Sequence, residues 1–127
     1  MKDVFVCVLR IQMCICFGGC DVIKCVYEKN KSGVRLTVNG HARYAQHGED
    51  IVCSAVSALT ETLIARLLEL NAKFSYKKEP GAVEIAMNRV TYDANEAFNF
   101  AVLGMQLIAT AYPKCVELQK SDTRVKQ

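Results

Sequence analysis

The chain has 127 residues, of which 51% are hydrophobic and 23% are charged, and its formal net charge is +3 at pH 7. This size and composition predict one packed domain and exclude an intrinsically disordered protein. No uncharged apolar run reaches the roughly 18 residues of a membrane-spanning helix, and so mild a positive charge does not by itself indicate nucleic-acid binding.

The seven cysteines are distributed unevenly along the chain. Four lie in the first twenty residues, and the other three are Cys25, Cys53 and Cys115. Seven is an odd number, and the chain is not a short disulfide-rich scaffold. We therefore expect a reduced, cytoplasmic protein.

The first 21 residues, "MKDVFVCVLRIQMCICFGGCD", differ in character from the remainder. A signal peptide ending in the lipobox-like "FGGC" is disfavoured, because Asp3 offsets Lys2 and Arg10 interrupts the apolar run. A metal site is disfavoured, because the cysteine spacing lacks a paired C-x2-C. The simplest interpretation is an extra strand or a loose tail whose cysteines act as small apolar residues.

A further hypothesis for residues 1–21 is that they are upstream sequence translated from a wrong start. Translation beginning at Val22 would open the protein on "IKCVYEKNKSGVRLTVNGHA", which is a natural first hairpin. Mass spectrometry of the natively expressed protein would test this, and an intact Met1 terminus would end the idea.

Residues 22–40 carry the pattern of a β-hairpin. "VIKCVYEK" alternates apolar and polar residues, "NKSG" has turn chemistry, and "VRLTVNG" alternates again. The apolar positions of the second strand are Val34, Leu36 and Val38.

Residues 41–50 read as a polar loop, after which the apolar period changes from two to three or four. A helix is predicted from about residue 51 to 71, about 30 Å long at 1.5 Å per residue. Asp50 lies where an N-cap belongs. The apolar stripe of this helix comprises Val52, Val56, Leu59, Leu63, Leu67 and Leu70.

The second half of the chain repeats the order of hairpin and helix. A hairpin is expected over residues 72–92, with Pro80 and Gly81 at its turn. "DANE" (93–96) resembles a capping box, so a second helix is expected over about 95–111, before Pro113. "KCVELQ" reads as a short final strand, and residues 121–127 as a frayed tail.

This order predicts an α+β fold in one domain over residues 22–120: a small mixed or antiparallel sheet with two helices packed on it. The second helical stripe comprises Phe98, Ala101, Met105, Ile108 and Tyr112.

Cys53 is the residue whose position suggests chemistry. As the third residue of the first helix it would lie among unpaired N–H groups at the positive end of the helix dipole. Such a position and a neighbouring imidazole both raise the thiolate fraction of a cysteine. An eleven-residue segment joins His41 to Cys53, which is long enough to bring the two side chains together. A lone helical cysteine is more often a buried apolar residue, and spacing does not decide between the two.

The stretch "GHARYAQHGEDIVCSAVSAL" resembles the signature of the ribosomal-processing cysteine proteases, the Prp family. The matching residues are Gly40-His41-Ala42, then Gly48-Glu49-Asp50-Ile51-Val52-Cys53, with Ser57 one turn further on. The segment "AYPKCVELQ" (111–119) looks like the family's closing Tyr-Pro and short strand. The resemblance covers about residues 22 to 120, and family members usually begin close to where Val22 stands.

The resemblance implies a His41–Cys53 catalytic dyad, a homodimer, and a substrate. That substrate is large-subunit ribosomal protein L-twenty-seven, in bacteria where it carries a short N-terminal extension that the protease removes before ribosome assembly. In such family members the peptide before the cut is apolar and aromatic. No cofactor, metal, membrane or direct nucleic-acid partner is expected. His47 falls at a variable loop position and receives no role.

Four further residues are expected to support the site. Asp50 would cap the helix and steady the loop or His41. Gly40 and Gly48 would let the loop backbone bend. Ser57, one turn after Cys53, would line the site or bond back to the helix.

The rival interpretation is a non-catalytic ribosome-associated binding module, and a weaker one is a thiol hydrolase of another peptide or ester. The reactivity of the thiol distinguishes the binding module from the protease, because a binding module needs no activated cysteine.

Overall fold

The computed structural model describes residues 22–40, 51–79 and 81–122. This part of the chain forms one five-stranded sheet and two helices, so the predicted single-domain α+β fold is confirmed. In chain order the elements are β1 (Ile23–Asn30), β2 (Gly33–Asn39), α2 (Ile51–Glu69), β3 (Ser75–Glu79), β4 (Ala82–Met87), α3 (Tyr92–Ala111) and β5 (Val116–Asp122).

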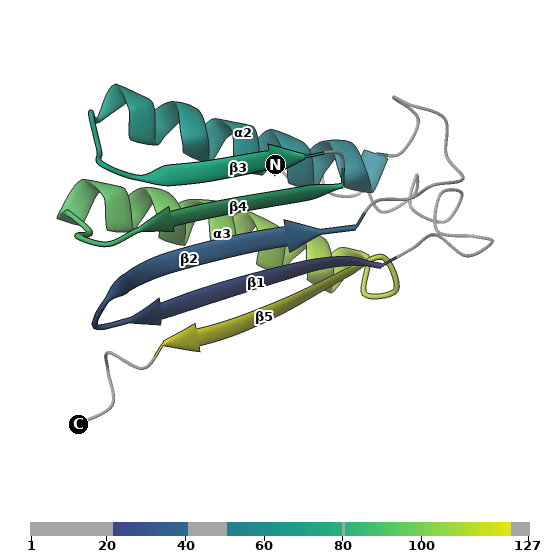
Figure 1. The fold of residues 1–127 in the computed structure, drawn as a ribbon. Coiled ribbons are helices and arrows are strands. Elements are labelled where there is room, and N and C mark those ends of the chain that lie inside the picture. Colours follow the sequence, from purple (N-terminus) through teal and green to yellow (C-terminus); the bar gives the residue numbers. More distant parts are fainter. Residues whose placement is uncertain (1–21, 41–50, 80, 123–127) are drawn as a thin grey trace.

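The sheet is mixed, with strand order β3-β4-β2-β1-β5. Three of its pairings are antiparallel, and β1 with β5 is parallel. Figure 1 shows α2 and α3 side by side on one face of the sheet, with β3 and β5 at its two edges. The molecule is therefore a two-layer sandwich of one sheet and one helical layer.

The strands turn alternate side chains toward the helices, as the sequence pattern predicts. Cys25 and Tyr27 of β1 face Val38 and Leu36 of β2 across the ladder, and all four are buried. The opposite face of the sheet is largely polar. It carries an ion pair between Arg35 and Glu84, 3.1 Å apart and exposed to solvent, whose contribution to stability is roughly 0–1 kcal/mol. Burial against the helices, rather than charge pairing, holds the sheet.

Both helices bury the stripes that their periodicity predicts, apart from a few positions that are partly buried at the rim. Gly104 of α3 lies against Leu59 of α2, and a Cβ at residue 104 would come within 2.8 Å of the Leu59 side chain. The two helices therefore pack closely at this crossing. The residues of the predicted stripes that are buried within the helices are Val52, Val56, Leu63 and Leu67 of α2 and Phe98, Ala101 and Met105 of α3.

The start of α3 differs from the prediction. The helix begins at Tyr92, and its N-cap is Thr91, whose hydroxyl accepts a hydrogen bond from the Ala94 N–H at 3.2 Å. The expected capping box at 93–96 is therefore wrong: these residues already belong to the helix. Thr91 has extended backbone geometry (φ −75°, ψ 168°) and a short hydroxyl side chain, which suit it to the cap.

Two other boundaries also move. α2 ends at Glu69 rather than near 71, because Asn71 adopts a left-handed conformation (φ 55°) that ends the helix. β5 continues through Ser121 and Asp122, so the frayed tail expected from residue 121 is wrong for these two residues. Parallel pairing with Glu28 and Lys29 of β1 extends the strand.

The expected N-terminal segment (1–21) and residues 123–127 lie outside the described residues. Neither α2 nor α3, the helices of the described part, is long and apolar enough to cross a membrane.

Cys25 supplies a test of the packed sheet. Its thiol is fully buried, and desolvation raises its pKa from 9.0 to about 11. The folded state thus favours the neutral thiol. The contribution of this thiol to the free energy of unfolding is complete below pH 9 and is lost as the pH rises through 11. We expect the free energy of unfolding to fall between pH 9 and 11 by up to roughly 3 kcal/mol from this group.

Urea titrations at pH 8 and pH 11 would measure this loss, with Cys25→Ala as the comparison. The variant is expected to be less stable at pH 8, because it leaves a small cavity, but to lose less stability on alkalinisation. Burial also raises the pKa of Tyr112, and the stability that this group loses at high pH is the same in both proteins. An equal alkaline loss in the two proteins would contradict the assignment to Cys25.

Candidate active site

Cys53 is the third residue of α2, the position that the sequence predicts. Its side chain carries a thiol, is partly buried, and packs against the hydrophobic core. The N–H groups of a helix's first turn have no acceptor within the helix, and the dipole there favours negative charge. The first turn of α2 contains no acidic residue. The position therefore suits a thiolate and offers donors to an oxyanion.

Gly40 follows directly after the strand β2 and is under tight geometric constraint. Its φ is +100°, and its N–H donates to the Gly81 carbonyl at 2.8 Å. A Cβ at residue 40 would lie only 2.6 Å from the Val22 carbonyl oxygen. Glycine is thus required both by the backbone conformation and by the close approach of β1.

The end of β2 and the start of α2 lie at the same end of the molecule (Figure 1). Gly40, Gly81 and Cys53 therefore belong to one rim of the sandwich. His41 follows Gly40 directly in the chain and begins the segment that leads to Cys53.

Three of the predicted site residues, His41, Gly48 and Asp50, lie outside the described residues, as does His47. The dyad, the hinge at Gly48 and the Asp50 cap stay predictions.

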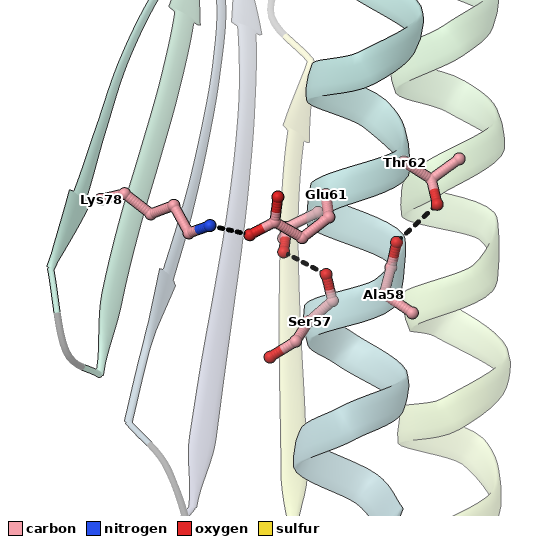
Figure 2. A network of polar contacts seen from close by, with 6 residues as sticks. Ser57, Ala58, Glu61, Thr62 and Lys78 are labelled. Atoms are coloured by element: carbon pink, nitrogen blue, oxygen red, sulfur yellow. Dashed lines mark hydrogen bonds and ion pairs between the residues drawn. The ribbon is translucent and has the colours of Figure 1, made fainter.

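Ser57 lies one turn after Cys53 and is exposed. Its carbonyl oxygen accepts a hydrogen bond of 2.8 Å from the hydroxyl of Thr60, a buried polar residue of the same helix (Figure 2). The side chain of Thr62 makes a similar bond, 2.6 Å long, to the Ala58 carbonyl. These bonds satisfy hydroxyls within α2.

An ion pair between Lys78 of β3 and Glu61 of α2 was not anticipated from the sequence. Figure 2 shows Lys78 reaching across to Glu61, two turns along α2 from Cys53, and both side chains are about half exposed. The residues are seventeen positions apart in different elements, so no local pattern in the sequence indicated the contact.

The structure also has a hollow of about 620 Å³ at the opposite end of β3 and β4 from the Cys53 rim. Its lining combines the cations Lys73 and Arg89 with apolar side chains that include Phe74 and Met87. Its described lining residues include no cysteine or histidine, and the hollow lies away from Cys53.

A thiol in the first turn of a helix is a position that reactive cysteines occupy, those of cysteine-dependent hydrolases among them. The family model for the cysteine protease Prp matches residues 22–117. The chain therefore belongs to the Prp family of ribosomal-processing cysteine proteases, and it is an enzyme of that class.

Similar proteins come from three bacteria. The ribosomal processing cysteine protease Prp of Mycoplasma genitalium is 26% identical over 85 residues, which cover 67% of this chain and 86% of that protein. The crystal structure of SMU.848 from Streptococcus mutans has a TM-score of 0.68 at 24% identity, covering 80% of this chain and 96% of that one. The essential ribosomal processing protease Prp from S. aureus, with a covalently linked product peptide, has a TM-score of 0.70 at 20% identity, covering 78% and 99%.

The constraint on Gly40 can be tested by Gly40→Ala. The added Cβ would meet the Val22 carbonyl in a conformation that alanine resists, so we expect a loss of about 1–3 kcal/mol in stability and a larger fractional loss of activity. Urea unfolding and peptide cleavage would measure the two effects. Asn39→Ala, on the exposed preceding residue, is the control and should change both little. Equal stability of the two variants would contradict the steric argument.

Proposed function

We propose that this protein is a cysteine endopeptidase that removes the short N-terminal extension of large-subunit ribosomal protein L-twenty-seven before ribosome assembly, in the cytoplasm. Cys53 is the nucleophile and His41 the general base. The observation that carries the proposal is the position of Cys53 in the first turn of α2, in a chain that belongs to the Prp family.

The substrate class is supported by the relatives. The M. genitalium relative is a ribosomal processing protease, and S. aureus Prp has been crystallised with a substrate peptide and with a covalently linked product peptide. A peptide substrate fits a thiol that is exposed enough to be reached and buried enough to be held in place.

In the proposed mechanism His41 accepts the Cys53 proton, and the sulfur attacks the carbonyl carbon of the scissile bond. Amides at the start of α2 donate to the oxyanion. When the C–N bond breaks, the leaving amine takes the proton from His41 and a thioester remains. Water then attacks the thioester while His41 accepts its proton, and Cys53 leaves as the thiolate with release of the carboxylic acid.

The supporting residues act through position. Gly40 sets the direction in which the chain leaves β2, immediately before His41. Asp50 caps α2, and Gly48 lets the intervening segment bend. Ser57 lines the approach to Cys53 from the next turn of the helix.

The proposal includes a homodimer, for which α3 offers a surface. Its outward stripe carries four large apolar side chains at helical spacing, all more than half exposed: Tyr92, Phe100, Leu103 and Leu107. The only charged residues of α3 are Asp93 and Glu96, near its start. Apolar exposure of this kind marks an interaction surface.

The catalytic assignment is tested with a peptide spanning the extension junction of the partner ribosomal protein from the same genome. Cys53→Ala and His41→Ala are each expected to lower kcat/KM at least about a thousandfold, because nucleophile and base act as a unit. Ser54→Ala, an exposed neighbour in the same turn, is the control and should cleave nearly as well as the parent.

Normal turnover by the Cys53→Ala protein would refute the nucleophile. A binding module would instead show peptide or ribosome binding with no cleavage by the parent chain, and a Cys53 alkylation rate no faster than that of an ordinary thiol.

The dimer is tested by analytical ultracentrifugation of Leu103→Glu. A charge placed within an apolar interface should convert the dimer to monomer at micromolar concentration. Leu68→Glu places the same charge at an exposed leucine of α2 and should leave the dimer intact. A parent protein that sediments as a monomer would exclude the interface.

A further inference from the structure

The outer edge of β3 has no strand partner among the described residues. β3 is the first strand in the sheet order and pairs only with β4, and all five of its residues are exposed. In an antiparallel ladder, alternate residues of an edge strand direct their N–H and C=O groups away from the sheet. Within the part of the chain that the structure describes, β3 thus presents an unpaired row of backbone donors and acceptors about 17 Å long.

This edge lies beside the helix that carries Cys53. Cys53, Ser57 and Glu61 recur at every fourth residue of α2 and so lie on adjoining turns of one side. Glu61 pairs with Lys78 of β3, so this side of α2 faces the β3 edge (Figure 2). Glu61 is about 12 Å along the helix from Cys53.

The other sheet edge lacks this relation to the thiol. β5 lies at the far side of the sheet, with β4, β2 and β1 between it and β3, and it packs against α3 rather than α2.

We propose that the polypeptide substrate binds as an added strand along the outer edge of β3, and that Glu61 and Lys78 are specificity-determining residues for the side chains it turns toward α2. This inference rests on the proposed peptidase function and deepens it. Main-chain hydrogen bonds to β3 supply affinity, while alternate side chains of the peptide meet α2 or solvent.

Two features of the structure favour an extended peptide as the occupant. The edge strand leads from the rim that carries Cys53 to the hollow at the start of β3, which includes Ser75 and Phe74 in its lining. Glu61 and Lys78, which we call the flank of this edge, are one acidic and one basic group beside it. The edge can therefore discriminate among peptides by charge. The pair is half exposed and contributes little to folding, which leaves it available for recognition.

The first test uses peptides of the extension junction that carry single backbone N-methyl groups. Each removes one N–H donor, and we expect the dissociation constant for the Cys53→Ala protein to rise about tenfold at every second residue along the part that lies on β3. Residues between them should show little change. Binding is read by fluorescence anisotropy, so the result does not depend on catalysis.

The second test is the charge reversal Glu61→Lys in the otherwise unchanged chain. At a peptide residue that faces Glu61 and Lys78, we expect the KM of this variant to fall for a peptide with Glu and to rise for a peptide with Lys. The ratio of kcat/KM between the two peptides should change about tenfold, while kcat stays near the parent value. The iodoacetamide rate at Cys53 should be unchanged, which separates recognition from a damaged site.

Glu69→Lys is the matched control. Glu69 lies on the same helix and also forms an ion pair, with Arg66 at 2.9 Å, but it is about 24 Å along α2 from Cys53. Equal changes in preference for the two variants, or N-methyl effects without the alternation, would overturn the proposal. Cleavage by the Cys53→Ala protein would overturn the proposed nucleophile instead, and would leave the binding pattern as evidence on its own.

Discussion

The rotation of α2 about its axis is the constraint on which the candidate site depends. Val52 and Val56 are 2% exposed, and with Leu67 they hold one side of the helix against the sheet. Each residue is turned by 100° from the last, so Cys53 falls at the border of the buried side. A cysteine there is anchored by the core and still reachable. One residue earlier it would be sealed in the core, as Cys25 is, where burial raises the thiol pKa to about 11.

Two kinds of terminus meet at the rim where Cys53 lies. The start of α2 contributes N–H groups that have no acceptor within the helix and the positive end of the helix dipole, and its first turn adds no acidic side chain to oppose a thiolate. Gly40, directly after β2, is held by a hydrogen bond to the Gly81 carbonyl and lies close against Val22, directly before β1. The chain is thus fixed on both sides of the segment that carries His41, which is the condition a base and a nucleophile from different elements require.

The surface divides into regions with different physical character. The open face of the sheet is polar and carries solvent-exposed ion pairing. The outward side of α3 is apolar and nearly free of charge, which suits association with another copy. The outer edge of β3 offers backbone groups instead of side chains, which suits an extended peptide of varied sequence. Catalysis, assembly and recognition can therefore use separate parts of a small domain.

Much of this protein follows from its sequence alone. Alternation over residues 22–40 and a three-to-four period from residue 51 predict the first hairpin and helix, because side-chain burial repeats with the geometry of each element. The same reasoning places Cys53 in the first turn of α2, and the run from Gly40 to Cys53 indicates the family. Local chemistry misleads at residues 93–96, where acidic and amide residues resemble a cap although Thr91 already fills that role.

Tertiary structure decided what depends on distant residues. The strand order, the parallel pairing that extends β5 to Asp122, and the edge position of β3 arise from long-range ladders that no local window contains. The requirement for glycine at residue 40 comes from the approach of Val22, eighteen positions earlier in the chain. The contact between Glu61 and Lys78 exists because β3 folds back beside α2. Sequence determined which elements form and which side of each is buried, since these are properties of short segments, whereas the folded chain alone determined which of their surfaces meet.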